Sequence, residues 1–328
     1  MMVGHCTCSC ACIALLACMS AHVFAQNNLQ YPIKPIRLLS PYAAGGGSDS
    51  LARVIAQKLN ESWGQPVIVD NRPSSGGTLG AELVAKAAPD GYTLFVTPSA
   101  VITINPHLYA KLRYDPFKEF TPVIAATNSP FYMVVHPKVP ANNVKEFIAY
   151  AKANPGKLNY GSSGNGSSAH LAGVLFGGLA NVDLVHIPYK GAAPATVDLL
   201  AGHVQFRFSS VVPAVPHVRT GRLRGLGMSS AKRYTPMPDV PTIAEAGLPG
   251  YAVEAFYVVM APAGTPRAIV EKLNAEITRR FKEPEVSARM AADGAEVIAA
   301  SVADTAKMLR DDYNRWAKPV KDSGARAD

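Results

Sequence analysis

Hydrophobic positions along the chain alternate between two spacings, one typical of buried strands and one typical of helices. Short apolar runs that predict strands lie at residues 36–42, 67–69, 92–97 and 131–136. Between the first two runs, apolar residues recur at helical spacing, at Leu51, Val54, Ile55 and Leu59. Strands that alternate with helices across short loops are the pattern of parallel βαβ units, so the sequence predicts an α/β fold.

A second series of the same kind starts near Phe131. It predicts helices at 143–153, 168–179 and 194–201 and strands at 158–162, 184–188, 204–208 and 223–228. A further strand at 253–261 precedes two more helices, and the last of these, at 302–318, carries an apolar face at Thr305, Leu309, Tyr313 and Trp316. The two series predict two domains, each a mostly parallel sheet flanked by helices.

The chain is expected to cross between the two domains near residues 127–131 and to return near 251–254. The predicted first domain is therefore discontinuous, with residues 26–128 and 252–328, and the second domain spans 129–251. Ligands of open α/β sheets bind at the carboxyl ends of the strands, which places the expected ligand cleft between the domains.

Two glycine-rich segments share one design, in which an apolar strand runs into bare backbone and then into a helix. We call them the first glycine loop (residues 42–49, YAAGGGSD) and the second glycine loop (residues 160–170, YGSSGNGSSAH). Glycine lets a ligand approach the main chain closely, and the free N–H groups at a helix N-terminus favour negative charge. Their separation along the chain indicates one anion held from two sides.

In the first glycine loop, Ser48 is the expected N-cap and Asp49 a first-turn acid that complements the helix dipole. A good helix start would explain both residues, but three successive glycines exceed what a cap requires. Because a bound anion would repel Asp49, we expect its carboxylate to orient a water molecule or a backbone amide.

The second glycine loop also fits a dinucleotide fingerprint, because residues 164–169 read G-x-G-x-x-A between a strand and a helix. That motif needs an acid at the end of the next strand, whereas Asp183 precedes the strand at 184–188 and Tyr189 follows it. No nicotinamide cofactor is therefore expected. The hydroxyls in the loop suit carboxylate oxygens or simple turns and caps, at Ser162, Ser163, Ser167 and Ser168.

The inventory of catalytic and metal-binding residues is small. The histidines are scattered one per element with no i/i+4 pair, so no metal site is expected. His170 alone is placed at the site, and a packed structural role is its alternative. Neither loop contains G-x-S-x-G or a P-loop motif. The protein is expected not to be an enzyme; the alternative is an exported hydrolase that uses Ser163 and His170.

The N-terminal residues predict export. Residues 10–25 are apolar and small, and they end in VFA before QNN, as at a signal-peptide cleavage site after Ala25. A lipoprotein anchored at Cys18 is the alternative. All five cysteines lie within the first 18 residues, so the mature chain has none. No later run approaches the roughly 20 apolar residues that a membrane span needs.

The formal net charge of +8 suits anionic partners. The sequence has no Lys/Arg runs and no basic residues interleaved with aromatic ones, which argues against nucleic acid and favours small anions. A role in solubility alone would also explain the charge.

Several sequence blocks resemble the periplasmic solute-binding proteins of tripartite tricarboxylate transporters, the Bug-type receptors. These blocks follow one another through nearly the whole mature chain, at residues 31–37, 41–49, 64–67, 71–73, 89–94, 159–161, 186–191, 238–242, 246–250 and 261–266. The resemblance implies a two-domain Venus flytrap. It also implies a monomer that closes on a small carboxylate and passes it to a two-component membrane permease, or presents it to a sensor instead.

The resemblance also implies which residues hold the ligand. The first glycine loop resembles the family's first-domain clamp, through Tyr42, Ala43, Gly46 and Asp49, and residues from Thr97 to Ser99 are expected to complete that wall. The second glycine loop resembles the second-domain clamp, with Ser162, Ser163, Asn165, Gly166, Ser167 and His170. Such clamps work largely through backbone groups and bridging water, and no cofactor is implied.

The chain departs from the family pattern after the strand at 204–208. Many members carry an acid where this chain has Ser209, and an acid there would suit a ligand's ammonium group. Ser209 therefore favours mono- or dicarboxylic or aromatic acids over amino acids. Arg207 is unusual in mid-strand, and it either faces the cleft as a second carboxylate anchor or lies on a solvent face.

Overall fold

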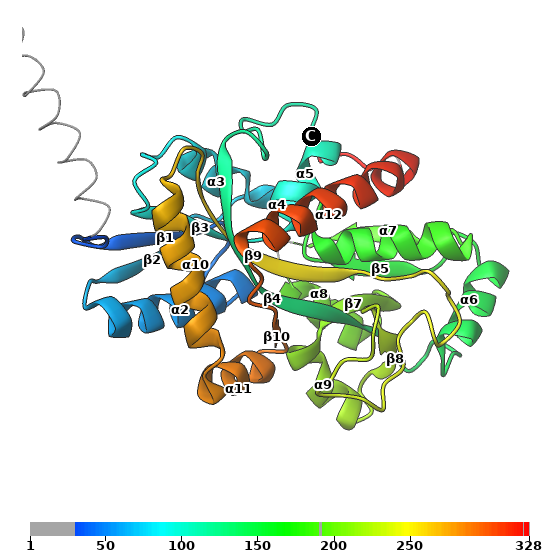
Figure 1. The fold of residues 1–328 in the computed structure, drawn as a ribbon. Coiled ribbons are helices and arrows are strands. Elements are labelled where there is room, and N and C mark those ends of the chain that lie inside the picture. The colour runs from blue at the N-terminus through cyan, green and yellow to red at the C-terminus, as the bar shows by residue number, and fades with distance from the viewer. Residues whose placement is uncertain (1–29, 190–191, 324, 328) are drawn as a thin grey trace, which may run out of the picture.

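The structure is a computed structural model that describes residues 30–189, 192–323 and 325–327. It confirms the α/β class, with helices on both faces of one curled, mixed sheet (Figure 1). The strand order along the sheet is β2-β1-β3-β9-β4-β7-β5-β6, and β8 and β10 pair with β4. The predicted signal peptide and the lipoprotein alternative at Cys18 lie outside the described residues.

The outer strands of the sheet pair in parallel, as the sequence predicts. At one end β1 (Ile36–Ser40) lies between β2 (Val67–Asn71) and β3 (Thr93–Pro98). At the other end β5 (Asn159–Ser162) lies between β6 (Val185–Pro188) and β7 (Phe206–Ser210). The two glycine loops follow β1 and β5, so each leaves the carboxyl end of a parallel strand.

The centre of the sheet is antiparallel. The 16-residue strand β4 (Phe120–Val135) pairs with β9 (Glu254–Pro262) through residues 120–130. Beyond that point it pairs with β7 and with β8 (Arg224–Met228), and β10 (Glu296–Val297) adds a short pair to its middle. One strand therefore belongs to both halves of the molecule, as Figure 1 shows.

Only the second part of β4 was predicted as a strand. The first part contains Pro122 and ends next to Pro130, and its register against β9 shifts after Pro122. Proline has no N–H to donate to the ladder, so a sequence with two prolines does not indicate a strand.

Helices cover both faces of the sheet. Around the first half lie α2 (Gly47–Trp63), α3 (Thr78–Ala85), α4 (Ala100–Thr103), α5 (Asn105–Leu108), α10 (Arg267–Phe281), α11 (Pro284–Ala292) and the 3-10 turn η1 (Ser75–Gly77). Around the second half lie α6 (Val144–Ala153), α7 (Ser168–Ala180), α8 (Ala192–Ala201) and α9 (Val211–Arg219). The short helices α4 and α5, the proline-containing α9 and the helix α11 were not predicted.

The strands are buried on both faces. In β1, Ile36 and Leu38 join the core beneath α2 and α10, whereas Leu39 joins the core on the opposite face. Apolar side chains on both faces explain why these strands read as continuous hydrophobic runs rather than as alternating ones.

The last helix, α12 (Val302–Ser323), packs against both halves. Its predicted core face is buried at Thr305, Leu309 and Trp316, whereas Tyr313 is half-buried. Asp312 is also buried, and it accepts hydrogen bonds from Thr103 Oγ1 at 2.7 Å and from Trp316 Nε1 at 3.1 Å. None of the helices in the described ranges is long and apolar enough to cross a membrane.

A pair of glycines in α7 tests the packing behind the second glycine loop. A Cβ at Gly173 would lie 2.3 Å from the ring of Tyr160, whereas a Cβ at Gly178 meets nothing within 4 Å. We expect Gly173→Ala to lower the free energy of unfolding by about 1–3 kcal/mol through overpacking. Gly178→Ala is the control and should raise it by about 0.5–1 kcal/mol through helix propensity. Urea unfolding measures both, and equal effects would contradict the packing.

Candidate functional site

The first glycine loop presents bare backbone to solvent. Residues 43–47 are exposed, and α2 begins after Gly46, whose φ of −87° and ψ of 172° are extended. No side chain caps this helix. The expected cap by Ser48 is wrong, because Ser48 lies inside the first turn, buried, with its hydroxyl 3.0 Å from that of Ser40. The first N–H groups of a 17-residue helix are thus left for another acceptor.

The carboxylate of Asp49 holds the backbone of this loop in place. Its Oδ2 accepts hydrogen bonds from the Gly45 amide and from Arg53 Nε, both at 2.9 Å. The expectation that Asp49 orients a backbone amide is confirmed. Burial alone raises the pKa of Asp49, but the hydrogen bonds from Arg53 and Gly45 outweigh it and hold the pKa below its usual value. Asp49 is therefore ionised, and its charge is already balanced by Arg53.

Tyrosines surround the first glycine loop. A Cβ at Gly47 would lie 2.3 Å from the hydroxyl of Tyr257, so glycine is required there. Burial, with the neighbouring Tyr257 and Tyr109, raises the pKa of Tyr42, which keeps its phenol protonated and able to donate a hydrogen bond. The Tyr42 carbonyl accepts from Asn71 Nδ2 at 3.1 Å.

The second glycine loop is held by its own serines. Ser167 caps α7, with its Oγ accepting from the His170 amide at 3.2 Å. Ser162 Oγ accepts from the Gly164 amide at 3.1 Å and lies 2.6 Å from His186 Nε2. Gly164 and Gly166 have φ of 129° and 74°, a region that favours glycine.

Two stacked imidazoles support this loop. The rings of His170 and His186 lie 3.8 Å apart, and His170 Nδ1 accepts from the Gly166 amide at 3.2 Å. Burial lowers the pKa of His170 to about 4, and burial together with His170 lowers that of His186 to about 3. Both rings are neutral near pH 7, and His170 acts on the loop from its packed side.

The second glycine loop meets the first half of the molecule at α5. A Cβ at Gly166 would lie 2.9 Å from Leu108 and 4.0 Å from Asn105 Oδ1. Asn105 Nδ2 in turn donates to the Gly76 carbonyl at 2.7 Å. Tyr109, directly after α5, lies against Gly76 and close enough to Tyr42 to affect its pKa. The second loop therefore faces the same part of the first half as the first loop.

The predicted site residues differ in exposure. Ala43, Gly46 and Asn165 are exposed; Tyr42, Ser163 and Ser167 are half-buried; Asp49, Thr97, Ser99, Ser162, Gly166, His170 and Ser209 are buried. Thr97 Oγ1 donates to the Pro98 carbonyl at 3.2 Å, and Ser99 precedes α4. Because both residues are buried, they support the first-domain side of the site from within.

Several contacts of the site were not predicted from the sequence, at Asn71, Asn105, Tyr109, His186 and Tyr257. A signal existed for His186 alone. It pairs with Tyr160 across the neighbouring parallel strands β5 and β6, both of which were predicted. Asn105 and Tyr109 lie on and directly after a short helix, and Asn71 and Tyr257 lie on β2 and β9, where spacing along the strand does not show which loop a side chain reaches.

The geometry for a serine hydrolase is not formed in the described part of the chain. His170 bonds the loop backbone and makes no hydrogen bond to Ser163. The serine that does meet a histidine is Ser162, which is fully buried against His186. Over the same residues, His, Asp and Glu side chains form no cluster that could hold a metal ion.

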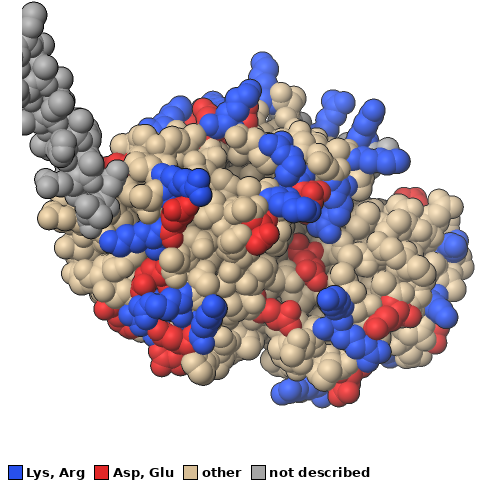
Figure 2. Space-filling model, viewed as in Figure 1, with Lys and Arg blue, Asp and Glu red and all other residues tan. Residues whose placement is uncertain are grey.

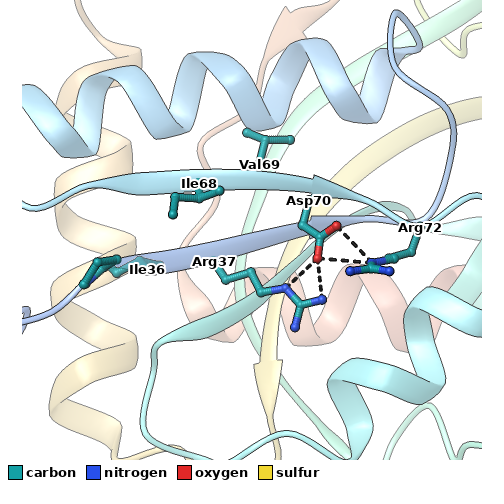
Figure 3. A pocket seen from close by; sticks show the side chains of 7 residues that line it. Ile36, Arg37, Ile68, Val69, Asp70 and Arg72 are labelled. Atoms are coloured by element: carbon teal, nitrogen blue, oxygen red, sulfur yellow. Dashed lines mark hydrogen bonds and ion pairs between the residues drawn. The ribbon is translucent and has the colours of Figure 1, made fainter.

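A separate surface pocket of about 330 Å³ lies at the β1–β2 edge of the sheet. Figure 3 shows Asp70 between Arg37 and Arg72, and the Arg37 Nε donates to Asp70 Oδ2 at 2.7 Å. The two guanidiniums hold the pKa of Asp70 below its usual value despite partial burial, which raises it. Since this acid already has both cations as partners, we assign the pocket no ligand.

The surface charge is dispersed. On the face shown in Figure 2, Lys and Arg side chains alternate with Asp and Glu rather than forming one basic surface. Many charged side chains of the described residues are paired, for example Arg233 with Glu245 and Lys307 with Asp311. Such a face does not resemble the continuous basic stripe of nucleic-acid-binding proteins.

Known proteins resemble this chain in sequence over most of its length. A model of the tripartite tricarboxylate transporter family receptor matches residues 51–325. Protein BugT of Bordetella pertussis is 37% identical over 297 residues, covering 90% of this chain and 91% of BugT.

Two solved structures are similar over nearly their whole length. Rpa4515 of R. palustris, solved with adipate, is 35% identical with a TM-score of 0.82, covering 90% of this chain and 99% of that one. MatC of Rhodopseudomonas palustris, with bound malate, is 34% identical with a TM-score of 0.79, covering 88% and 100%.

The stacked histidines predict a pH dependence of stability. Their pKa values lie below the ordinary value of 6.5, so the unfolded chain binds more protons than the folded one below that pH. Stability should therefore fall as the pH drops from about 6.5 towards 4. Urea unfolding at pH 7.5 and 5.0 measures this loss, which we expect to be about 1–2 kcal/mol per histidine.

A variant that keeps the hydrogen bond to Ser162 shows whether His186 causes this loss of stability. His186→Gln can still bond Ser162 but does not titrate, so its stability should change less between the two pH values. His203→Gln is the matched control, because His203 is exposed in the turn after α8. Its stability should change between the two pH values by as much as that of the unchanged protein. The same pH dependence in all three proteins would contradict the assignment.

Proposed function

The chain belongs to the tripartite tricarboxylate transporter receptor family, as its sequence blocks predicted, and from this premise we propose that it captures a small carboxylate between its two glycine loops and delivers it to a two-component membrane permease. Membership makes it a solute-binding receptor. The carboxylate class, the delivery and the residues at the site are the proposed part.

One observation carries the proposal. Helix α2 starts at an exposed glycine, so no side chain accepts from its first amides, whereas Ser167 accepts at the start of α7. A ligand oxygen can take the place of the missing cap, because the free amides and the helix dipole favour negative charge. The protonated phenols of Tyr42 and Tyr257 add donors at the same loop.

The second loop supplies the other side of the clamp. It stands at the N-terminus of the 13-residue helix α7, and Gly166 lies against α5, next to the wall of the first loop. Of the relatives, one was solved with adipate and one with malate; both are dicarboxylates, which supports a carboxylic acid of this kind for this chain as well.

Closure around the ligand would use the crossing strands. We propose that residues 26–128 with 252–328 and residues 129–251 move as two domains about β4 and β9. The change of pairing partner along β4, at residues 130–131, supports a boundary there. A ligand that binds the closed form more tightly shifts the population towards it.

Family members are periplasmic receptors, which supports export of this chain by the signal peptide predicted before Gln26. We propose that the receptor works as a monomer without a cofactor, and that it binds its ligand without turnover. The neutral, buried Ser162–His186 pair lacks a carboxylate to orient the imidazole, which favours binding over hydrolysis.

Isothermal titration of residues 26–328 with mono-, di- and tricarboxylic and aromatic acids tests the proposed ligand class. We expect saturable one-to-one binding of at least one acid, with a higher melting temperature in its presence. If none of these classes binds, the carboxylate proposal fails. If esters of the same acids are turned over and Ser163→Ala stops this, the protein is a hydrolase instead.

Gly46→Ser tests the first loop itself. The serine fits, since a Cβ at Gly46 has only the Ala43 carbonyl within 4 Å, at 3.7 Å, and its hydroxyl can cap α2. We expect equal or higher stability by urea unfolding but at least tenfold weaker binding, about 1.4 kcal/mol, since the cap competes for the ligand's amides.

Gly178→Ala is the control for this prediction, because Gly178 lies near the C-terminal end of α7, away from the loop at the N-terminus of that helix. It should leave the affinity unchanged. Unchanged affinity in Gly46→Ser would show that the ligand does not use these amides.

A further inference from the structure

The last helix, α12, is buried in the core of the first half at one end and in the core of the second half at the other. Thr305 Oγ1 accepts from the Ala125 amide of β4 at 2.7 Å, and Leu309 lies in the core around β3 and β9. Further along the helix, Trp316 and Val320 lie in the core that contains α7. Figure 1 shows the helix running beside α4 and on to α7, so it joins the halves separately from the crossing strands β4 and β9.

The end of α12 lies behind the place where the second glycine loop meets the first half. Leu108 of α5 belongs to the same core as the end of α12, and a Cβ at Gly166 would lie 2.9 Å from it. After the helix, the Ala327 amide donates to the Leu108 carbonyl at 3.2 Å. One side of α5 therefore faces the second glycine loop, and the C-terminal residues pack against another.

Helices of the second half are tied to that half by hydrogen bonds. Arg207 faces neither the cleft nor solvent, the two positions that the sequence left open; it is only 2% exposed and donates from β7 to the Ala192 carbonyl of α8 at 2.7 Å. The Tyr251 hydroxyl donates to the Ala172 carbonyl of α7 at 3.0 Å. Helices α7 and α8 are therefore expected to move with the second half.

The contact between α12 and α7 is of a different kind. Asp312 accepts from Thr103 Oγ1 of α4 at 2.7 Å, which ties the middle of α12 to the first half as Thr305 ties its start. The indole Nε1 of Trp316 donates to the same Asp312 at 3.1 Å. The polar atom of the indole is thus satisfied within its own helix, and Trp316 meets α7 with apolar surface. Separating this contact breaks no hydrogen bond of the indole.

A movement of the halves would act unequally on the two ends of α12. The helix has its one proline at 319, beyond Trp316, so it is uninterrupted between its anchors in the first half and the indole. If the first turns stay on β4 while the halves rotate, the last turns must leave α7. The apolar contact exists here together with the close approach of Leu108 to Gly166. It therefore stabilises the arrangement in which the second glycine loop meets the first half.

We propose that Trp316 and Val320 form an interdomain clasp on α7, which is made when the second glycine loop meets the first half and is released when the halves separate. The inference rests on the proposed function, and it assigns to the C-terminal helix the balance between the open and the closed receptor. Because the apparent affinity follows the fraction of binding-competent molecules, the clasp sets the affinity without touching the ligand.

Substitutions at the two ends of α12 test the clasp. Val320→Ala weakens the clasp, and Leu309→Ala is its matched control, because both side chains are 1% exposed and lie in different halves. Urea unfolding should show a loss of stability in both. Only Val320→Ala should weaken the binding of adipate or malate, by about threefold, and Trp316→Leu should weaken it by about tenfold or more. The Kd of Leu309→Ala should stay within about twofold of the original.

A distance measurement tests the clasp without any ligand. The chain from residue 26 has no cysteine, so spin labels can be attached at Ala275→Cys in α10 and Ala149→Cys in α6, both at exposed positions. We expect the distance distribution of Trp316→Leu and of Val320→Ala to differ from that of the unchanged protein, whereas that of Leu309→Ala should not. Saturation with adipate or malate should bring all four proteins to one distribution.

Two results would overturn the inference. One is an unchanged Kd or an unchanged distance distribution in Trp316→Leu and Val320→Ala, which would show that the end of α12 stays on α7 in every state. The other is an equal effect of Leu309→Ala, which would show that any loss of core packing loosens the receptor. If Trp316→Leu does not fold, Val320→Ala decides.

The outcome for the clasp is distinguishable from that for the proposed function. If the distances change as expected but no carboxylic acid binds, the proposed function fails and the clasp stands. If an acid binds the unchanged protein and the clasp variants bind it equally well, the clasp fails and the proposed function stands.

Discussion

The backbone pairing of β4 is the constraint on which the other features depend. This strand bonds to β9 along its first part and to β7 and β8 along its second, so a single chain segment fixes how the two halves of the sheet stand to each other. The glycine loops leave β1 and β5, which lie on opposite sides of it. Because the outer strands on each side are parallel, both loops start from carboxyl ends. A rotation about this strand would therefore change the gap between the loops while leaving each loop intact.

The fold could be predicted from the sequence where local pattern and tertiary environment agree. The strand at 36–42 is apolar because both its faces are covered, and the helix at 143–153 starts at Asn143, which caps it by accepting from the Glu146 amide at 2.9 Å. The first part of β4 could not be predicted, because its prolines contradict a strand and its pairing comes from β9, more than a hundred residues later. The four-residue helices α4 and α5 are too short to show a period, and they are stabilised by α12.

The sequence predicts a candidate site only to the extent that the chemistry of that site resides in the backbone. Glycines in a row after a strand indicate a close approach by a ligand, and this identifies both loops without any partner being known. The side chains that support the two loops were harder to predict from the sequence. His170 was placed correctly near the second loop, yet its partner His186 lies on the next strand, and their contact depends on the register of β5 against β6. Tyr257 reaches Gly47 from a strand that enters the sheet from the far end of the chain. Arg207 was noticed as unusual, but alternation along a strand could not show which helix covers it.

The two glycine loops contain no Lys or Arg, so any positive potential at them comes from amides and helix ends. At the first loop the charge of Asp49 is balanced by Arg53, so the dipole of α2 remains available to a ligand. At the second loop both imidazoles are neutral at physiological pH. An exposed lysine would attract many anions and would lose its hydration on binding each of them. Amides at helix ends are already held in place by the fold, so the cost of organising them is met by folding rather than by binding. Each loop is fixed within its own half of the molecule, so closure brings together groups that are already oriented to receive negative charge.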